Sequence, residues 1–284
     1  MTATIALIGH PVAHSISPRF QQAALDAAGV DAHYEAWDTT PEALPAAIER
    51  LRSGDVLGAN VTVPHKVAAL RLIERPDPLA ELVGAVNTIW RERGLLHATN
   101  TDVAGVLHAL ADAGVTLAGE HVVLLGAGGA ARAVVVALRR AGAASLTIAN
   151  RTLPRAQALA ELAGQGLPAS VCELDPGSDA LRGALMRAGL VIHSTPLGMR
   201  HGPDERATPL PADCFHRGQV AFDLVYVPER TPFLDATASA GARTVGGLAM
   251  LVHQGAESFR LWTGREPSLE VMFAAARAAL DGAR

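Results

Sequence analysis

The segment Val122-Val-Leu-Leu-Gly126-Ala-Gly128-Gly129-Ala-Ala131 decides the fold of the second half of this chain. Its first four apolar residues predict a buried strand, and the Ala- and Val-rich run after it predicts a helix over 130–141. The glycines between them fit the pattern G-x-G-x-x-A at a strand-to-helix turn. Gly126 permits a tight turn, Gly128 lets the backbone approach a pyrophosphate, and Ala131 allows close packing of helix on strand. Because the helix amino terminus would face the phosphates, the segment predicts a dinucleotide site; a purely structural turn is the alternative.

Outward from this segment, strands and helices alternate along the chain. We expect strands at 4–8, 34–37, 58–63, 121–125, 145–149, 190–194, 220–224 and 243–245, and a hairpin over 85–98. We expect helices at 18–28, 42–52, 64–73, 103–113, 130–141, 155–163, 232–240, 248–262 and 268–280. This alternation predicts an α/β fold with parallel sheets covered by helices on both faces. Residues 114–120 are the best candidate for a domain boundary.

Composition limits the class of protein. The chain has 284 residues, a formal net charge of −4, 49% hydrophobic and 18% charged residues, which suits one large or two medium globular domains and excludes global disorder. The charge gives no case for nucleic acid or an anionic membrane surface, and no apolar run is long enough for a membrane span. Two cysteines make no disulfide framework, and the amino terminus lacks the basic region of a secretory signal. The few cysteines and the missing signal and membrane segments predict a cytoplasmic protein. The 11 histidines are scattered along the chain, so we expect no metal site.

Lysine usage is unusual. Of the 24 Lys and Arg residues, one is Lys, namely Lys66, and the remaining 23 are Arg. Arg suffices where only a positive charge is needed, but a Lys can release its proton and an Arg in a protein cannot. Lys66 therefore predicts a position that requires a titratable amine, against the alternative of one leftover surface Lys.

The end of the second strand of the dinucleotide-binding half indicates which dinucleotide binds. An acidic residue usually stands there in NAD-binding proteins, to hold the ribose 2′-hydroxyl. Here the chain reads Asn150-Arg151-Thr152, followed by Arg155. Guanidinium groups suit a phosphate, and two charged hydrogen bonds of about 1.5–3 kcal/mol each would favour the 2′-phosphate by about 100- to 10,000-fold. We therefore expect NADP, with solvated surface arginines as the alternative.

The first half carries polar residues where strands end. Ser15 and Ser17 stand before a predicted helix and could bind a carboxylate, although Ser17 could instead only cap that helix. Thr62 and Lys66 lie at a strand-to-helix corner, and Asn87 lies in the hairpin region. Asp102 precedes another predicted helix, where it could be only a cap.

Together these motifs resemble shikimate dehydrogenases along nearly the whole chain. The matching segments, in order, are Gly9-His-Pro-Val-Ala-His-Ser-Ile-Ser-Pro18, Gly58-Ala-Asn-Val-Thr-Val-Pro-His-Lys66, Gly84-Ala-Val-Asn-Thr88, Asn100-Thr-Asp102, Gly126-Ala-Gly-Gly-Ala130, Asn150-Arg-Thr152, Thr195-Pro-Leu-Gly-Met199, Asp223-Leu-Val-Tyr226 and Gly246-Gly-Leu-Ala-Met-Leu-Val-His-Gln254. Nine ordered matches are far more specific than any one motif.

The resemblance implies reversible reduction of 3-dehydroshikimate to shikimate with NADPH, in aromatic amino-acid biosynthesis. It implies a substrate-binding and catalytic α/β domain with a mostly parallel sheet, made of residues 1–102 and 248–284. A Rossmann-type, doubly wound NADP domain would span 103–247, with the active site in the cleft between the two domains. The expected partner is the small-molecule substrate. We expect the protein to be a monomer or a homodimer.

The resemblance also assigns residues by their positions in these motifs. Lys66 and Asp102 would be catalytic. The substrate would be bound by Ser15 and Ser17 at its carboxylate, by Thr62, Lys66, Asn87, Asp102 and Gln254 at the ring hydroxyls, and by Tyr226 nearby. The cofactor would be bound by Gly126, Ala127, Gly128, Gly129, Ala130, Asn150, Arg151, Thr152, Arg155, Thr195, Leu224, Gly247 and Met250.

The chemistry fits Lys66 and Asp102. Oxidation of a secondary alcohol removes the hydroxyl proton as hydride leaves carbon, and reduction needs a proton donor at the carbonyl oxygen. Lys66 can do both, and Asp102 can orient its amine and hydrogen-bond the reacting hydroxyl. Either of the two can carry the transferred proton on this interpretation.

Some positions depart from the family pattern, namely His10, Gln21-Gln22, Ala98 and His193, the last standing where Asn is usual. None is assigned to proton transfer, but they leave open a quinate or aminoshikimate dehydrogenase of the same family. Quinate-using relatives often carry Thr at the second hydroxyl position and an acidic residue at the cofactor ribose, whereas this chain has Ser17 and Asn150-Arg151. A non-catalytic NADP-binding sensor is the alternative from another class.

Overall fold

The computed structural model describes residues 2–282 of the chain. The chain divides into two compact units, which are described separately below. Unit 1 comprises Met1–Gly105 and Val252–Arg284, and unit 2 comprises Val106–Leu251. The divisions fall inside two long helices, α5 (Asp102–Asp112) and α10 (Leu248–Thr263). The predicted boundary at 114–120 is therefore wrong: the chain passes between units as helix, and no linker composition marks the place.

Unit 1 contains a six-stranded sheet in the order β2-β1-β3-β5-β6-β4. These strands are β1 (Ala3–Gly9), β2 (Ala32–Asp38), β3 (Val56–Val61), β4 (Arg75–Pro76), β5 (Thr88–Glu92) and β6 (Leu95–Thr99). The β1 strand pairs in parallel with β2 and β3, and β5 pairs antiparallel with β3 and β6. The predicted hairpin is confirmed: both residues of its turn, Arg93 and Gly94, have positive φ, which matches the twist of the paired strands.

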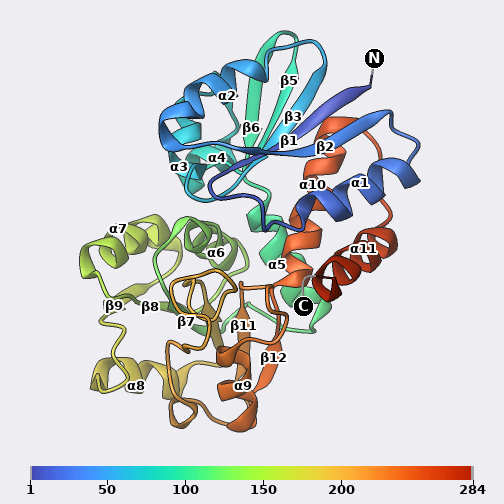
Figure 1. Ribbon diagram of the computed structural model, residues 1–284. Helices are drawn as coiled ribbons and strands as arrows, with labels where there is room; N and C mark the ends of the chain where they lie inside the picture. Colours follow the sequence, from blue (N-terminus) through green and yellow to red (C-terminus); the bar gives the residue numbers. More distant parts are fainter. Residues whose placement is uncertain (1, 283–284) are drawn as a thin grey trace. The chain divides into compact units, whose positions relative to one another are not determined.

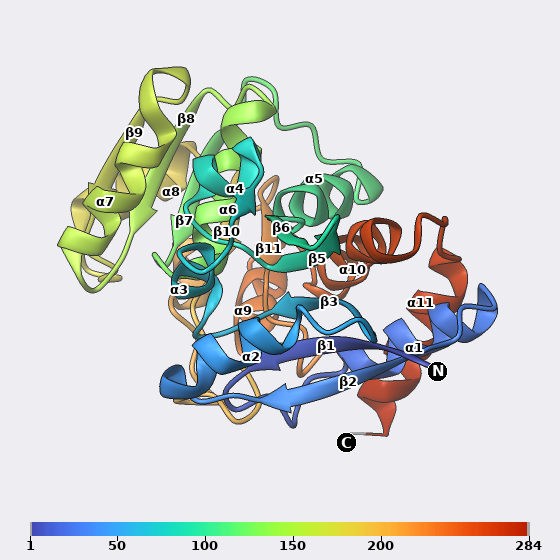
Figure 2. The ribbon, with the colours of Figure 1, turned by 90° about the horizontal axis from the view of Figure 1, so that it is seen from above.

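Helices cover both faces of this sheet (Figures 1 and 2). One face carries α2 (Leu44–Arg50), α3 (Lys66–Leu70) and α4 (Pro78–Val83), whose apolar side chains form a core cluster with β1, β3 and β5. The other face carries α1 (Ser17–Ala27), α10 and α11 (Leu269–Asp281). A short 3₁₀ turn, η1 (Pro41–Ala43), leads into α2.

Unit 2 contains a second six-stranded sheet, in which every pairing is parallel, in the order β12-β11-β10-β7-β8-β9. Its strands are β7 (His121–Leu125), β8 (Ser145–Ala149), β9 (Ala169–Cys172), β10 (Leu190–His193), β11 (Val220–Asp223) and β12 (Arg243–Val245). The chain adds strands first to one side of β7 and then to the other. The strand order therefore reverses between β7 and β10, where doubly wound sheets bind ligands.

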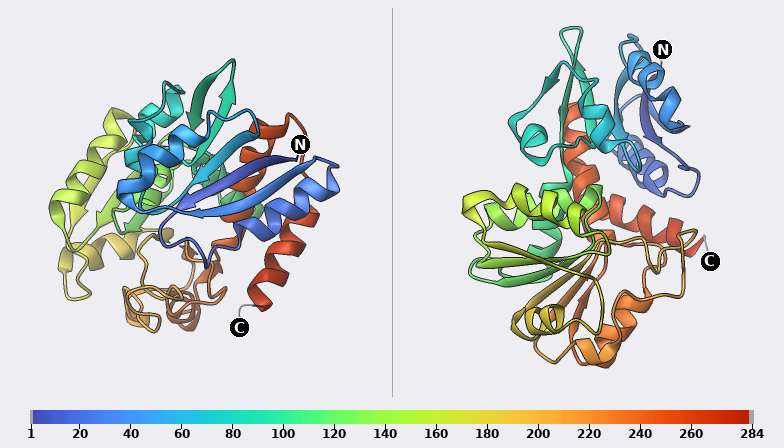
Figure 3. Two further views of the ribbon diagram at one scale, coloured as in Figure 1. Left: turned by 45° about the horizontal axis from the view of Figure 1, so that its top comes forward. Right: turned by 90° about the vertical axis from the view of Figure 1, so that its left-hand side faces the viewer.

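Helices lie on both faces of the second sheet as well, as Figures 1 and 3 show. One face carries α6 (Gly129–Arg140) and α7 (Leu153–Ala163), and the other carries α8 (Asp179–Arg187) and α9 (Pro232–Ser239). Two 3₁₀ turns, η2 (Gly164–Gly166) and η3 (Ala212–Cys214), complete this unit. The predicted α/β fold with a doubly wound, parallel second half is confirmed.

The differences from prediction are confined to short elements. The helix expected over 64–73 spans only α3, and β4, α4, β9 and α8 were not predicted from the sequence. Their signals are local but weak: α4 has six residues, with the Asp77 carboxylate accepting from the Ala80 amide at its start. Among the described residues, no helix is long and apolar enough to cross a membrane.

Candidate active site

The lone lysine forms a nearly buried ion pair in unit 1. Lys66 is the first residue of α3, shortly after β3 ends, and Asp102 is the first residue of α5, shortly after β6 ends. The Lys66 Nζ donates to Asp102 Oδ2, with 15% of the lysine and 5% of the aspartate side chain exposed. The alternative of a leftover surface lysine is therefore wrong. Asp102 is also more than a cap, because its carboxylate is engaged by side chains from two other segments.

Asn87 connects this ion pair to helix α10. Its Nδ2 lies 2.9 Å from Asp102 Oδ1, 2.9 Å from Thr101 Oγ1 and 3.1 Å from Gln254 Oε1. The Asn87 Oδ1 accepts from the Thr101 amide at 2.7 Å. Both Asp102 oxygens therefore accept hydrogen bonds. The Lys66 ammonium group has three hydrogens and donates only one of them to Asp102. Four of the predicted residues, Lys66, Asn87, Asp102 and Gln254, are brought together in this way.

A network of buried polar side chains lies beside Asn87 and Gln254, and no role was predicted for it from the sequence. Ser258 Oγ hydrogen-bonds Thr88 Oγ1 at 2.7 Å and accepts from Asn60 Nδ2 at 3.0 Å, and it donates to the Gln254 carbonyl at 3.0 Å. Asn60 Oδ1 accepts from the Tyr34 hydroxyl at 2.8 Å. The signal available in the sequence was polar side chains at positions whose neighbours predict buried strand and helix.

The remaining predicted residues of unit 1 surround the ends of β1 and β3. The α1 helix begins at Ser17, and its cap position, Ile16, makes no side-chain cap bond, so Ser17 is not the cap residue. The Ser17 amide donates to Ser15 Oγ at 3.2 Å. Thr62 packs so closely on Gly9 that a Cβ there would lie 2.4 Å from the threonine methyl carbon. Position 9 therefore requires glycine.

Helix α1 is tied to α10 one residue beyond Gln254. Gln21 Nε2 donates to the Gly255 carbonyl at 2.9 Å, and a Cβ at Gly255 would lie 2.6 Å from the Phe20 ring. Gln22 Oε1 accepts from the Tyr34 amide at 2.9 Å, which fixes the start of β2. These two departures from the family pattern therefore make structural contacts within unit 1.

In unit 2, the glycine-rich turn has the geometry that its pattern predicts. Gly126 follows β7 with φ of +108°, and a Cβ there would lie 2.8 Å from Ser194 Oγ and 2.9 Å from Thr195 Cγ2. Gly128 is the cap position of α6, with no side chain to occupy the first amides of that 12-residue helix. Open amides at a helix start, approached over bare glycine backbone, fit the pyrophosphate of a dinucleotide.

The two predicted phosphate-binding arginines follow β8. Arg151 and Arg155 are exposed, and neither forms an ion pair within the part of the chain that the structure describes. Asn150 Nδ2 donates to the Thr152 carbonyl at 2.9 Å, which shapes the turn that carries them. Guanidinium groups without a carboxylate partner suit a phosphate ligand.

Other predicted cofactor residues follow β10, β11 and β12. Thr195 lies two residues beyond β10 and touches the Gly126 turn, as described. The Leu224 carbonyl lies so close to Gly247 that a Cβ there would be 2.5 Å away. Met250 is buried in the first turn of α10, and Tyr226 is partly buried after β11. Thr195, Leu224 and Gly247 thus share the carboxyl edge of the second sheet with the glycine-rich turn.

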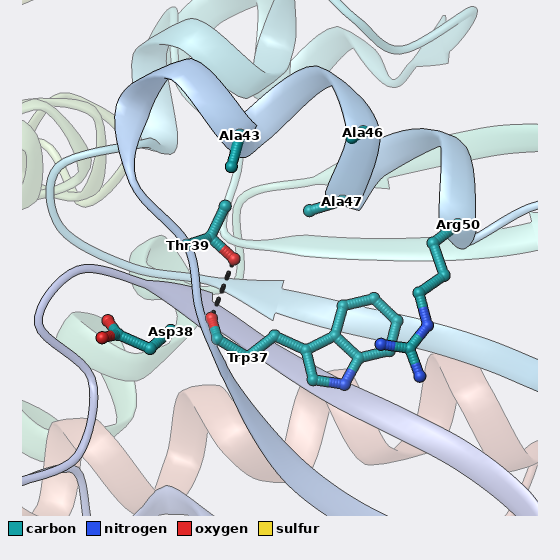
Figure 4. A pocket seen from close by; sticks show the side chains of 7 residues that line it. All are labelled: Trp37, Asp38, Thr39, Ala43, Ala46, Ala47 and Arg50. Atoms are coloured by element: carbon teal, nitrogen blue, oxygen red, sulfur yellow. Dashed lines mark hydrogen bonds between the residues drawn. The ribbon is translucent and has the colours of Figure 1, made fainter.

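A separate hollow lies beside β2 and α2 (Figure 4). Its lining residues are Trp37, Asp38, Thr39, Ala43, Ala46, Ala47 and Arg50. The Arg50 guanidinium stacks 3.9 Å from the Trp37 ring centroid, and Thr39 Oγ1 donates to the Trp37 carbonyl. None of the predicted site residues lines it, so it is distinct from the candidate site. Within residues 2–282, no group of three or more His, Cys, Asp and Glu side chains could hold a metal ion.

The doubly wound sheet with its glycine-rich turn, together with a lysine–aspartate pair in a second α/β unit, defines a dinucleotide-dependent dehydrogenase. Three family models match: the shikimate dehydrogenase substrate binding domain over 7–89, shikimate / quinate 5-dehydrogenase over 109–197, and the shikimate 5'-dehydrogenase C-terminal domain over 247–277. The shikimate dehydrogenase (NADP(+)) of Moorella thermoacetica is 48% identical, covering 95% of this chain and 91% of its own length. The chain belongs to the shikimate dehydrogenase family.

Two further relatives agree over nearly full length. The shikimate dehydrogenase (NADP(+)) of Symbiobacterium thermophilum is 47% identical, over 98% of this chain and 95% of that protein. The crystal structure of shikimate 5-dehydrogenase from Thermus thermophilus, in complex with NADP(H) and shikimate, is 43% identical with a TM-score of 0.87. The match covers 98% of this chain and 100% of the Thermus thermophilus chain.

Proposed function

We propose that this chain catalyses the reversible, NADPH-dependent reduction of 3-dehydroshikimate to shikimate. The observation that carries the proposal is the nearly buried Lys66–Asp102 pair, held by Asn87 beside Gln254, in a chain of this family. A proton donor must act where hydride adds to a carbonyl carbon, and this pair supplies the only lysine of the chain.

Within the pair, Lys66 carries the proton and Asp102 orients it. Asp102 accepts from Lys66 at one oxygen and from Asn87 at the other, which orients the amine, while Lys66 Nζ keeps hydrogens for the substrate. In reduction, Lys66 gives a proton to the substrate carbonyl oxygen as hydride arrives at carbon. In oxidation, the amine takes the proton back from the hydroxyl.

The other residues of unit 1 would bind the substrate. Ser15 and Ser17 hold the carboxylate at the start of α1. Thr62, Asn87 and Gln254 contact the ring hydroxyls together with the ion pair. Tyr226 is proposed as a further substrate contact. Unit 1 is accordingly proposed as the substrate-binding unit, within a few residues of 1–102 and 248–284.

Unit 2 would bind NADP, which supplies or accepts the hydride when bound. The amides at the start of α6, over the backbone from Gly126 to Ala130, would hold the pyrophosphate. The turn after β8 would hold the 2′-phosphate through Arg151 and Arg155. The remaining contacts with the cofactor are proposed for Asn150, Thr152, Thr195, Leu224, Gly247 and Met250.

The deciding experiment measures kcat/KM for shikimate and for quinate, each with NADP and with NAD. We expect shikimate with NADP to exceed the other three combinations by at least about tenfold. A higher value with quinate would contradict the proposed substrate, and comparable values with NAD and NADP would contradict the cofactor preference. NADPH binding without turnover of either substrate would instead support the sensor alternative.

We also propose a cytoplasmic enzyme that is a monomer or a homodimer. Both thiols, Cys172 and Cys214, are free and buried, as suits a reducing compartment. Burial raises the pKa of each thiol and keeps it unreactive. Light scattering after size exclusion measures the oligomeric state; a larger assembly would contradict this proposal.

A further inference from the structure

A histidine–aspartate pair lies fully buried in unit 2, where β10 and β11 end. His193 Nδ1 lies 2.9 Å from Asp223 Oδ1, and neither side chain is exposed. The His193 ring packs against Phe233 with centroids 4.9 Å apart. Neither residue belongs to the proposed proton-transfer or cofactor-contacting set. Buried polar side chains are costly unless they are hydrogen-bonded, and a hydrogen-bonded buried network holds its neighbours rigidly.

The hydrogen bonds around Asp223 determine the tautomer of His193. Asp223 Oδ1 also accepts from the Val225 amide at 2.9 Å, and Oδ2 accepts from the Thr231 hydroxyl. A carboxylate has no hydrogen to give, so His193 Nδ1 is the donor in the pair. In the neutral imidazole Nε2 is then an acceptor, and its partner is the hydroxyl of Thr195.

These bonds reach two parts of the carboxyl edge. On one side, His193 Nε2 hydrogen-bonds the Thr195 hydroxyl, which also accepts from the Leu197 amide at 3.3 Å, and the Thr195 methyl carbon lies against the Gly126 turn. On the other side, the Leu224 amide donates to the His193 carbonyl at 2.9 Å. Since Asp223 holds the next amide, the Leu224 carbonyl stays in close approach to Gly247.

We propose that His193 and Asp223 are positioning residues for the dinucleotide. They hold Thr195 against the glycine-rich turn and the Leu224–Val225 backbone against Gly247, so that both edges of the site are set before the ligand arrives. This inference rests on the proposed NADP site in unit 2. It adds a role for His193, at a position where the family pattern has Asn.

The test compares His193→Leu, His193→Asn and Thr195→Val with the unmodified chain. NADPH affinity is measured from nicotinamide fluorescence, and folding from the thermal midpoint. We expect His193→Leu and Thr195→Val each to weaken NADPH binding by about tenfold, the effect of losing about one hydrogen bond. His193→Asn, whose amide keeps a donor and an acceptor, should stay within about threefold although its smaller side chain lowers the midpoint.

A double variant, His193→Leu with Thr195→Val, separates positioning from simple packing. If His193 acts through Thr195, the double variant binds NADPH no more weakly than either single variant. Additive losses, or affinities within about twofold of the unmodified chain while the midpoint falls, would overturn the inference. Should His193→Leu not fold, NADPH binding by Thr195→Val at unmodified affinity would overturn it by itself. An unmodified chain that fails to bind NADPH contradicts the proposed function instead.

Discussion

The Lys66 ammonium group donates to the Asp102 carboxylate although 36 positions separate the two residues in the chain. Each stands at the first position of a helix that follows a strand of the same sheet. Asn87 reaches the other oxygen of Asp102 from the start of β5. Residues beside three strand ends therefore meet at one ion pair, and this pair contains the single lysine of the chain.

Replacing Lys66 tests the proton-transfer role. We expect Lys66→Ala to lower kcat by about 100- to 10,000-fold, with a much smaller rise in KM for shikimate. Lys66→Arg should not restore kcat, because a guanidinium group keeps its proton. Steady-state kinetics in both directions measure these effects. A kcat for Lys66→Ala within a few-fold of the unmodified chain would refute the role.

Replacing Asp102 separates orientation of the amine from proton transfer. Asp102→Asn removes the charge but keeps the shape, so we expect a smaller loss of kcat, about 10- to 100-fold, and a loss of unfolding free energy of about 1–3 kcal/mol. The matched control is Asp235→Asn, which removes an exposed ion pair with Arg230 and should change stability little. If Asp102→Asn costs as much kcat as Lys66→Ala, Asp102 takes part in the transfer itself.

Replacing the arginines after β8 tests the cofactor preference. Arg151→Ala and Arg155→Ala should each lower the ratio of kcat/KM with NADP to that with NAD by about tenfold, since each would lose a charged hydrogen bond to the 2′-phosphate. The control is Arg140→Ala, an exposed arginine in the last turn of α6. An unchanged ratio in both site variants means that these are only solvated surface arginines.

Gly126→Ala tests the glycine-rich turn. Its positive φ and the contacts with Ser194 and Thr195 leave no room for a methyl group, so we expect NADPH affinity and stability both to fall, the latter by about 1–3 kcal/mol. Gly142→Ala is the matched control: φ is +74° there, but nothing lies within 4 Å of the added carbon. It should lower stability alone. Equal NADPH affinities in the two variants would show that the crowding at Gly126 is irrelevant to binding.

Ser258→Ala tests the buried polar network. Its hydroxyl contacts Asn60 and Thr88, so its loss leaves buried polar atoms with fewer partners. We expect urea unfolding to show a loss of about 1–3 kcal/mol, against less than about 0.5 kcal/mol for Ser239→Ala on the surface. A loss as small as that of the control would mean that the network reorganises without cost.

Local patterns in the sequence determined much of this protein. The strand–turn–helix around Gly126, the missing acidic residue at Asn150 and the single lysine are properties of short segments, whose geometry depends on neighbouring residues. Their order along the chain was sufficient for the family resemblance. Elements of four to nine residues, such as β9 and α8, were missed because short segments depend on tertiary packing more than on their own pattern.

Only the tertiary structure decided which polar side chains meet. Lys66, Asn87, Asp102 and Gln254 come from four segments, and their contact depends on the strand order β3-β5-β6 and on the packing of α10 against that sheet. The pairing of His193 with Asp223 likewise depends on β10 lying beside β11 in register. Side-chain hydrogen bonds act over about 3 Å, so they form only where the packing of strands and helices has already brought the two side chains together.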